Sequence, residues 1–110
     1  MAGQLGYFAL PSNDPQASMV FYGGLFGWQF DEESEHGGHH ILNTAEPFGC
    51  VGGARDGVPT LYFTVDDIHE AVKRVRELGG EADEPVLRES GWDAACRDSQ
   101  GLVFNLWQAT

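Results

Sequence analysis

Apolar positions recur along the chain with two different periods, and these periods predict its secondary structure. Apolar side chains spaced three and four residues apart predict helices over residues 16–26 and 67–78. Shorter apolar runs, bounded by glycine pairs and other turn residues, predict strands. The strands are expected at residues 6–10, 28–30, 39–44, 49–55, 61–65, 86–89, 92–97 and 102–108.

The first predicted helix has clear start and stop signals. Asp14 is expected to cap it, and Pro15 suits its first position, where a missing N–H group costs nothing. Gly27 is a natural stop. An apolar stripe along this helix consists of Ala17, Val20, Phe21 and Leu25.

The second predicted helix has similar signals and one apolar face. Asp66 is expected to cap it, and the glycine pair 79–80 is expected to end it. The residues at helical spacing that give it one buried face are Ile68, Ala71, Val72, Val75 and Leu78.

The predicted elements occur in the same order twice. Strand, helix and three strands repeat with a period of about 53 to 55 residues, and residues 7–10 (YFAL) mirror residues 62–65 (YFTV). We therefore predict an α+β fold of two βαβββ modules in a single domain over residues 1–110. Module one covers about residues 1–55 and module two about residues 58–110.

The formal net charge of −11 makes some classes of binding partner more suitable than others. A negative field opposes binding to nucleic acid and to anionic membranes, and it attracts a cationic small molecule or a basic partner. The same charge also serves solubility alone. The sequence has neither a run of apolar residues long enough to span a bilayer nor a signal peptide, so we expect a cytoplasmic protein with Cys50 and Cys96 reduced.

Three segments resemble signatures of one known superfamily. These are residues 21–28 (FYGGLFGW), residues 65–68 (VDDI) with a helix that ends in LGG, and residues 98–107 (DSQGLVFNLW). In this order and spacing they resemble the glyoxalase / bleomycin-resistance / extradiol-dioxygenase superfamily, also called vicinal oxygen chelate proteins, over nearly the whole chain.

The resemblance implies an architecture and a place for ligands. Each module would curl its sheet around a cavity, with a helix outside, and two modules would form an open cup that binds ligands inside. Family members build the cup within one chain or between two chains, which leaves a homodimer open.

The resemblance also implies where a divalent metal would bind in catalytic members. Their ligands are His or Gln on the first strand of each module and Glu or His on the last strand. The matching positions here are Tyr7, Tyr62, Asn105 and either Gly52 or Gly53. Phenols, a glycine and a neutral amide make a poor site for a divalent metal. We therefore predict no metal and no other cofactor.

Three clustered histidines are the alternative source of metal ligands. His39 and His40 are adjacent, so they face opposite sides of a strand, and His36 lies across a glycine pair. These side chains belong to a solvated turn, or one of them enters the cavity. His69, in the first turn of the second helix, is expected to be exposed.

Aromatic residues are the stronger candidates for ligand binding. Tyr7 and Tyr62 are either core tyrosines or a pair of phenols that line the cup and stack on a planar ligand. Trp107 and Trp92 would add stacking surface, and Asn105 would orient a polar group of the ligand.

Two classes of function follow from these residues. The first is a metal-free binding protein that resembles the bleomycin-resistance branch and sequesters a planar, cationic drug or metabolite. The second is a metal-independent lyase, isomerase or natural-product tailoring enzyme that uses Tyr7, Tyr62 or a cavity histidine as an acid–base group. A subunit that assists another protein is a third option. Binding is favoured because it requires only a cavity.

Overall fold

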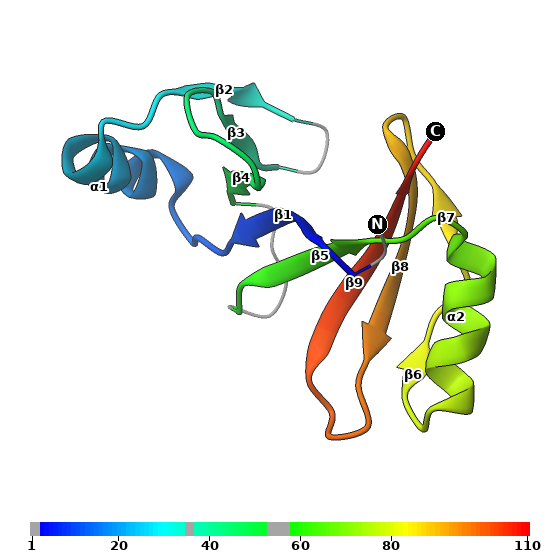
Figure 1. Cartoon of the computed structure of the whole chain (residues 1–110). Coiled ribbons are helices and arrows are strands. Elements are labelled where there is room, and N and C mark those ends of the chain that lie inside the picture. Colours follow the sequence, from blue (N-terminus) through cyan, green and yellow to red (C-terminus); the bar gives the residue numbers. More distant parts are fainter. Residues whose placement is uncertain (1–2, 35–36, 53–57) are drawn as a thin grey trace. The chain divides into compact units, whose positions relative to one another are not determined.

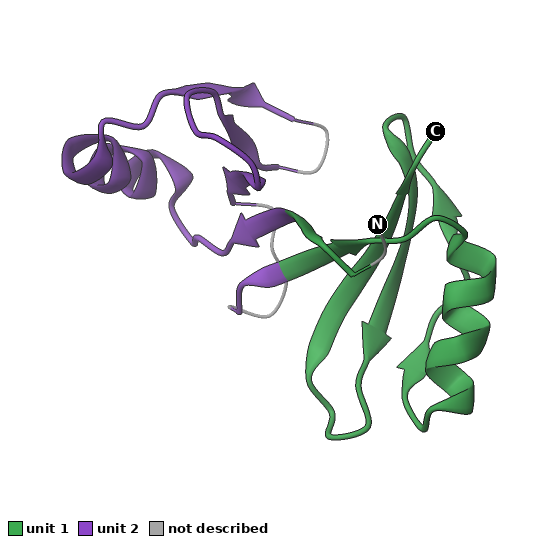
Figure 2. Ribbon diagram, viewed as in Figure 1, with its two compact units in different colours: residues 1–6, 61–110 green, residues 7–60 purple. Residues whose placement is uncertain are grey.

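The chain folds into two compact units, each with one helix and a mixed sheet. The computed structural model describes residues 3–34, 37–52 and 58–110. Unit 1 comprises residues 1–6 and 61–110, and unit 2 comprises residues 7–60 (Figure 2). Helices and strands occur in both units (Figure 1), so the predicted α+β class is confirmed.

Unit 2 contains the first helix and its strands. Three of its strands are antiparallel neighbours, in the order β2-β3-β4, and β4 runs parallel to β1 at the end of this order. The elements are β1 (Leu5–Leu10), whose residues 7–10 belong to this unit, α1 (Pro15–Phe26), β2 (Phe30–Glu33), β3 (His39–Ile41) and β4 (Phe48–Val51).

The predicted ends of α1 are confirmed. The Asp14 carboxylate accepts a hydrogen bond from the backbone N–H of Ala17, and Pro15 occupies the first position. Gly27 ends the helix with φ = 74°, a left-handed conformation that glycine adopts without a steric penalty. Local sequence signals were sufficient to place both ends.

The strands of unit 2 do not bury the apolar stripe of α1. All residues of α1 are described, and none of them is buried. The four large apolar side chains Val20, Phe21, Leu25 and Phe26 are 76%, 63%, 60% and 57% exposed. The side that is half-buried instead carries Ser18, Met19, Tyr22 and Gly23.

Unit 1 contains the second helix and a longer sheet. Strand β5 is parallel to β9, β9 is antiparallel to β8, and the two short strands β6 and β7 both pair with β8. The elements are β5 (Thr60–Thr64), whose residues 61–64 belong to this unit, α2 (Ile68–Glu77), β6 (Glu81–Ala82), β7 (Val86–Leu87), β8 (Gly91–Arg97) and β9 (Val103–Ala109). Strand β6 was missing from the sequence prediction because two residues are too few to show alternation.

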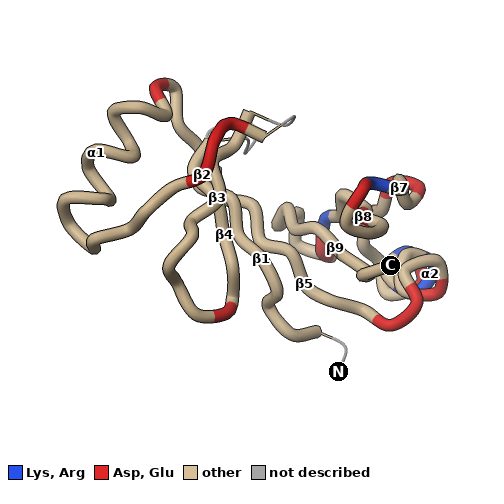
Figure 3. Tube along the Cα trace, turned by 90° about the horizontal axis from the view of Figure 1, so that it is seen from above, with Lys and Arg blue, Asp and Glu red and all other residues tan. Residues whose placement is uncertain are grey.

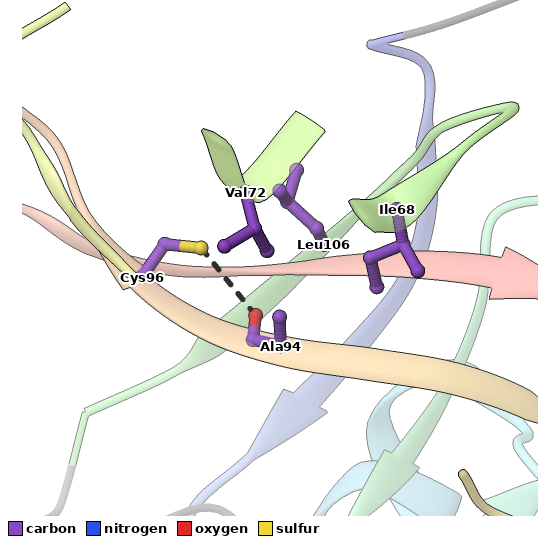
Figure 4. Close-up of a cluster of buried hydrophobic side chains, with 5 residues drawn as sticks. All are labelled: Ile68, Val72, Ala94, Cys96 and Leu106. Atoms are coloured by element: carbon purple, nitrogen blue, oxygen red, sulfur yellow. Dashed lines mark hydrogen bonds between the residues drawn. The ribbon is translucent and has the colours of Figure 1, made fainter. Parts of the chain in front are cut away.

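Helix α2 packs its apolar face on this sheet. Ile68 and Val72 are buried against Ala94, Cys96 and Leu106 of β8 and β9 (Figure 4). The cap prediction was wrong by one residue. The side chain of Asp67, and not that of Asp66, accepts hydrogen bonds from the N–H groups of His69 and Glu70.

The two units repeat the same connectivity. In each one the first strand leads into a helix, and the last strand returns parallel to the first with an antiparallel neighbour on its other side. The predicted internal repeat is therefore present in the strand pairing. Among the described residues, no helix has the length and apolar character needed to cross a bilayer.

Candidate functional site

Three of the predicted site residues share one face of the unit 1 sheet. Tyr62 of β5 lies opposite Asn105 of β9, and Trp107 follows two residues later on β9. Their neighbours Phe63 and Leu106 belong to the core under α2. Since successive side chains on a strand point to opposite faces, Tyr62, Asn105 and Trp107 lie on the face away from α2. All three are half-buried.

Trp92 lies on the other face of this sheet. It packs against the core cluster under α2, and its ring contacts the ring of His69 edge-on with centroids 5.1 Å apart. The reason is register, since Trp92 lies opposite Gln108, one residue beyond Trp107. The structure therefore does not bring Trp92 together with Asn105 and Trp107.

Asp93, and not Trp92, lies on the sheet face of Tyr62, Asn105 and Trp107, which we call the site face. It lies directly opposite Trp107, so their side chains lie on the same face. Its carboxylate accepts a hydrogen bond from Nε of Arg88 at 3.1 Å, and its side chain is 19% exposed. The sequence contains a signal for this placement. Ala94 and Cys96 continue an alternating apolar pattern that begins at Trp92 and leaves Asp93 on the opposite side.

Tyr7 belongs to a separate group of side chains in unit 2. Its ring contacts that of His40 edge-on, with centroids 5.9 Å apart. Cys50 lies opposite His40 in the sheet, and its thiol forms a side-chain hydrogen bond with Tyr7. Burial raises the pKa of Cys50, and the bond to Tyr7 lowers it by a smaller amount. The thiol is therefore a poor nucleophile at neutral pH.

His39 and His69 lie outside this group. The Nδ1 atom of His39 is 2.9 Å from the carbonyl oxygen of Asp31. His39 precedes His40 on β3, so the two rings face opposite sides as predicted. His36 lies outside the described residues, and His69 is exposed as expected.

The side chains at the expected metal-ligand positions, on the first and last strands of each unit, do not fit a divalent metal. Tyr62 lies opposite Asn105, and the residue opposite Tyr7 is Phe48. The prediction of Gly52 or Gly53 for this position was wrong, because β4 pairs with β1 from its first residue onward. Gly52 follows β4, and Gly53 is outside the described residues. Phenyl, phenol and amide groups are poor metal ligands. In the part of the chain that the structure describes, no three His, Cys, Asp or Glu side chains are grouped to hold a metal ion.

Positive charge is confined to one unit among the described residues. All the Lys and Arg side chains that the structure describes belong to unit 1, whereas Asp and Glu occur in both units (Figure 3). Arg88 is the basic side chain bonded to Asp93 on the site face. Among the Asp, Glu, Lys and Arg side chains, the described part of unit 2 therefore carries only acidic ones. The site face of unit 1 carries an ion pair.

Comparisons of the sequence with known proteins identify one family. The model of the Glyoxalase/Bleomycin resistance protein/Dioxygenase superfamily matches residues 4–106. The Mycobacterium bovis protein CFP32, provisionally named a glyoxylase, is 29% identical over 97% of this chain and 46% of its own length. The anthracycline biosynthesis protein DnrV of Streptomyces peucetius is 31% identical over 96% of this chain and 47% of its own length. The chain thus spans about half the length of these relatives.

Solved structures show the same fold at low sequence identity. The hypothetical protein BH1468 of Bacillus halodurans has a TM-score of 0.71 and 14% identity, covering 98% of this chain and 95% of its own. The methylmalonyl-CoA epimerase of Streptomyces coelicolor, in complex with 2-nitronate-propionyl-CoA, has a TM-score of 0.67 and 15% identity, covering 100% of this chain and 99% of its own. Similarity at this level supports the fold of the chain and not an activity.

Proposed function

Because this chain belongs to the glyoxalase/bleomycin resistance protein/dioxygenase superfamily, we propose that it is a metal-free binding protein of the bleomycin-resistance type. Its ligand would be a planar, cationic small molecule held on the site face of unit 1. The observation that carries the proposal is that one sheet face combines Tyr62, Asn105 and Trp107 with the carboxylate of Asp93.

These side chains supply the contacts that a planar cation requires. The rings of Tyr62 and Trp107 offer stacking surface, and an aromatic face also attracts a positive charge. The Asn105 amide can donate and accept hydrogen bonds. Asp93 supplies a carboxylate beside Trp107 on this face, and its ion pair with Arg88 holds the carboxylate in position.

The charge of the whole chain favours the same class of ligand. With a formal net charge of −11, the protein attracts cations over a distance set by the ionic strength. Such a field raises the rate of association for a cationic ligand and lowers it for an anionic one. We therefore expect the affinity for a planar cation to fall as salt is added.

The names of the relatives suggest a concrete probe. Two of them are named for anthracycline biosynthesis. An anthracycline has a flat, fused-ring chromophore, and in doxorubicin the attached sugar carries a protonated amine. Doxorubicin therefore combines the two features that the site face of unit 1 is suited to bind. Its aglycone keeps the rings and lacks the amine.

Fluorescence titration of doxorubicin and of its aglycone tests this proposal. Trp107→Ala should weaken binding of both compounds about tenfold, because it removes stacking surface. Asp93→Asn should weaken binding of doxorubicin and leave the aglycone unaffected. Tyr22→Ala, a half-buried tyrosine of α1, serves as the control. If neither compound binds, or if the control weakens binding as much as Trp107→Ala does, the proposal is wrong.

A second candidate function is a metal-independent lyase, isomerase or tailoring activity. The contact between Tyr7 and His40 in unit 2 favours it, because a phenol and an imidazole in contact are suited to acid–base catalysis. Incubation with doxorubicin, followed by mass analysis, would detect a product. Such a product should disappear with Tyr7→Phe and persist with His39→Ala, whose ring faces the other side. Unchanged doxorubicin would count against this activity on the proposed ligand.

A further inference from the structure

The ion pair of Arg88 and Asp93 is the least exposed one between described residues. The side chain of Asp93 is 19% exposed and that of Arg88 is 39% exposed. In the other ion pairs between described residues, each side chain is between 47% and 81% exposed. Charges that are partly shielded from water attract and repel other charges more strongly than charges that water surrounds. A charged ligand on the site face therefore interacts with both members of this pair.

Asp93 lies between Arg88 and Trp107 on the site face. Trp107 lies opposite Asp93 on β9, and β7 pairs with the other edge of β8. Arg88 directly follows β7, where its backbone N–H donates to the carbonyl oxygen of Gly91 at 2.7 Å. Because neighbouring strands lie about 4.8 Å apart, the indole ring, the carboxylate and the guanidinium follow one another within the length of a small ligand.

The ion pair uses only part of the hydrogen-bonding capacity of Arg88. The Nε atom of Arg88 donates to Oδ2 of Asp93 at 3.1 Å. A guanidinium has five N–H donors, and four of them belong to its two terminal nitrogens, which lie outside this bond. Parallel donors of this kind match the two oxygens of a carboxylate. Arg88 is thus equipped to bind an acidic group while it stays paired with Asp93.

The charges of the pair determine which ligands it favours. Arg88 and Asp93 sum to zero, so a ligand with a single ammonium group is attracted by Asp93 and repelled by Arg88. A ligand with an ammonium group and an adjacent carboxylate avoids this repulsion, since each of its charges meets the opposite one. A ligand with negative charge alone is disfavoured by the formal net charge of −11.

We propose that the ligand of the site face is a planar zwitterion, with an ammonium group bound by Asp93 and an adjacent carboxylate bound by Arg88. Its ring stacks on Trp107. This inference rests on the proposed function and narrows the ligand class to aromatic amino acids and compounds with the same arrangement of charges. Arg88 is then the residue that distinguishes such a zwitterion from a simple planar cation.

Tryptophan and tryptamine test this inference as a matched pair of probes. Both have an indole ring and a protonated amine at neutral pH, and only tryptophan has a carboxylate. NMR titration of the full chain, which follows the backbone N–H and arginine Nε–H signals, gives both dissociation constants and locates the contacts. We expect tryptophan to bind about fivefold to tenfold more tightly and to shift the Nε–H signal of Arg88. The long-range field alone predicts the reverse order, because tryptamine has the higher positive charge.

Two arginine variants separate the local contact from the general effect of charge. Arg88→Gln should reverse the order, so that tryptamine binds more tightly than tryptophan. Arg74→Gln also removes one positive charge and breaks an ion pair, but it does so on α2, which covers the opposite face of the sheet. The order of the two probes should therefore persist in Arg74→Gln. Circular dichroism checks that both variants are folded, and the comparison of the probes on the unmodified protein decides if Arg88→Gln is not.

The outcomes separate this inference from the proposed function. Equal binding of the probes to the unmodified protein, or tighter binding of tryptamine, would overturn the inference, as would a reversed order in Arg74→Gln. The proposed binding of a planar cation still stands in these cases if tryptamine binds and Trp107→Ala weakens its binding. If neither probe binds, the inference is wrong, and the titration with doxorubicin decides the proposed function by itself.

Discussion

The two helices hold the same place in the repeat and differ in how they meet the rest of the chain. Helix α2 buries Ile68 and Val72 on the sheet of unit 1 and carries its charged side chains on the outer side. Helix α1 has no charged side chain and no buried residue. A helix with one apolar and one polar side buries the first against a sheet and exposes the second to water. In contrast, α1 is apolar on a side that its own unit leaves exposed. The same connectivity therefore does not ensure the same packing, because the side-chain pattern of each helix decides how much of it a sheet can cover.

The largest expected effect is the loss of unfolding free energy when a buried apolar residue of α2, rather than an exposed one of α1, is truncated. Ile68→Ala should lower the free energy of unfolding by about 2–5 kcal/mol, because it leaves a cavity under α2. Val20→Ala in α1 should change it by less than about 0.5 kcal/mol, because Val20 is 76% exposed. Urea denaturation of both variants measures the two values. Equal losses would mean that Val20 is buried as deeply as Ile68.

A smaller effect distinguishes two glycines of unit 2. A Cβ atom at Gly49 would clash with the ring of Phe8, whereas one at Gly24 would have no atom within 4 Å. Gly49→Ala should therefore destabilise the protein by about 1–3 kcal/mol through overpacking. Gly24→Ala should stabilise the protein by about 0.5–1 kcal/mol, because alanine favours a helix. Thermal unfolding monitored by circular dichroism gives both signs. A loss of stability in Gly24→Ala would show that the chain itself uses this glycine.

The smallest effect concerns the caps of the two helices. The Asp67 carboxylate accepts two backbone hydrogen bonds at the start of α2, and that of Asp14 accepts one at the start of α1. We expect Asp67→Ala to lower the unfolding free energy by about 1 kcal/mol and Asp14→Ala by somewhat less. Asp66→Ala is the control, since Asp66 is not the cap. An equal loss with Asp66→Ala in urea denaturation would mean that general charge, and not capping, sets the effect.

Much of the fold was predictable because its signals are local. The cap at Asp14 and the stop at Gly27 depend on a few neighbouring residues, and they were predicted correctly. Asp66 was predicted as the cap of α2, but Asp67 is the cap. Both residues can cap a helix, and the residue at which helical geometry begins decides between them. The order of strands and helices was predictable because it repeats.

The candidate site was harder to predict because it depends on register. Strand alternation placed Tyr62 on the face away from the core, since Phe63 beside it is apolar. Alternation within β8 likewise indicates that Asp93 lies on the site face and Trp92 on the core face. Trp92 was predicted on the site face only because its large aromatic ring suits stacking. The pairing of Tyr7 with Phe48 was not predictable, because a short strand such as β4 can pair at several offsets.

The sequence by itself determined the family, the repeated order of elements, the alternation along β5 and the uncharged character of α1. These follow from local propensity, side-chain periodicity and motifs, all of which are properties of neighbouring residues. Only the tertiary structure decided that Asp93 lies beside Trp107, that His40 and Cys50 gather around Tyr7, and that the sheet of unit 2 leaves Val20, Phe21 and Leu25 uncovered. Those features depend on which distant residues pair across strands and on how much of a helix its own sheet can cover.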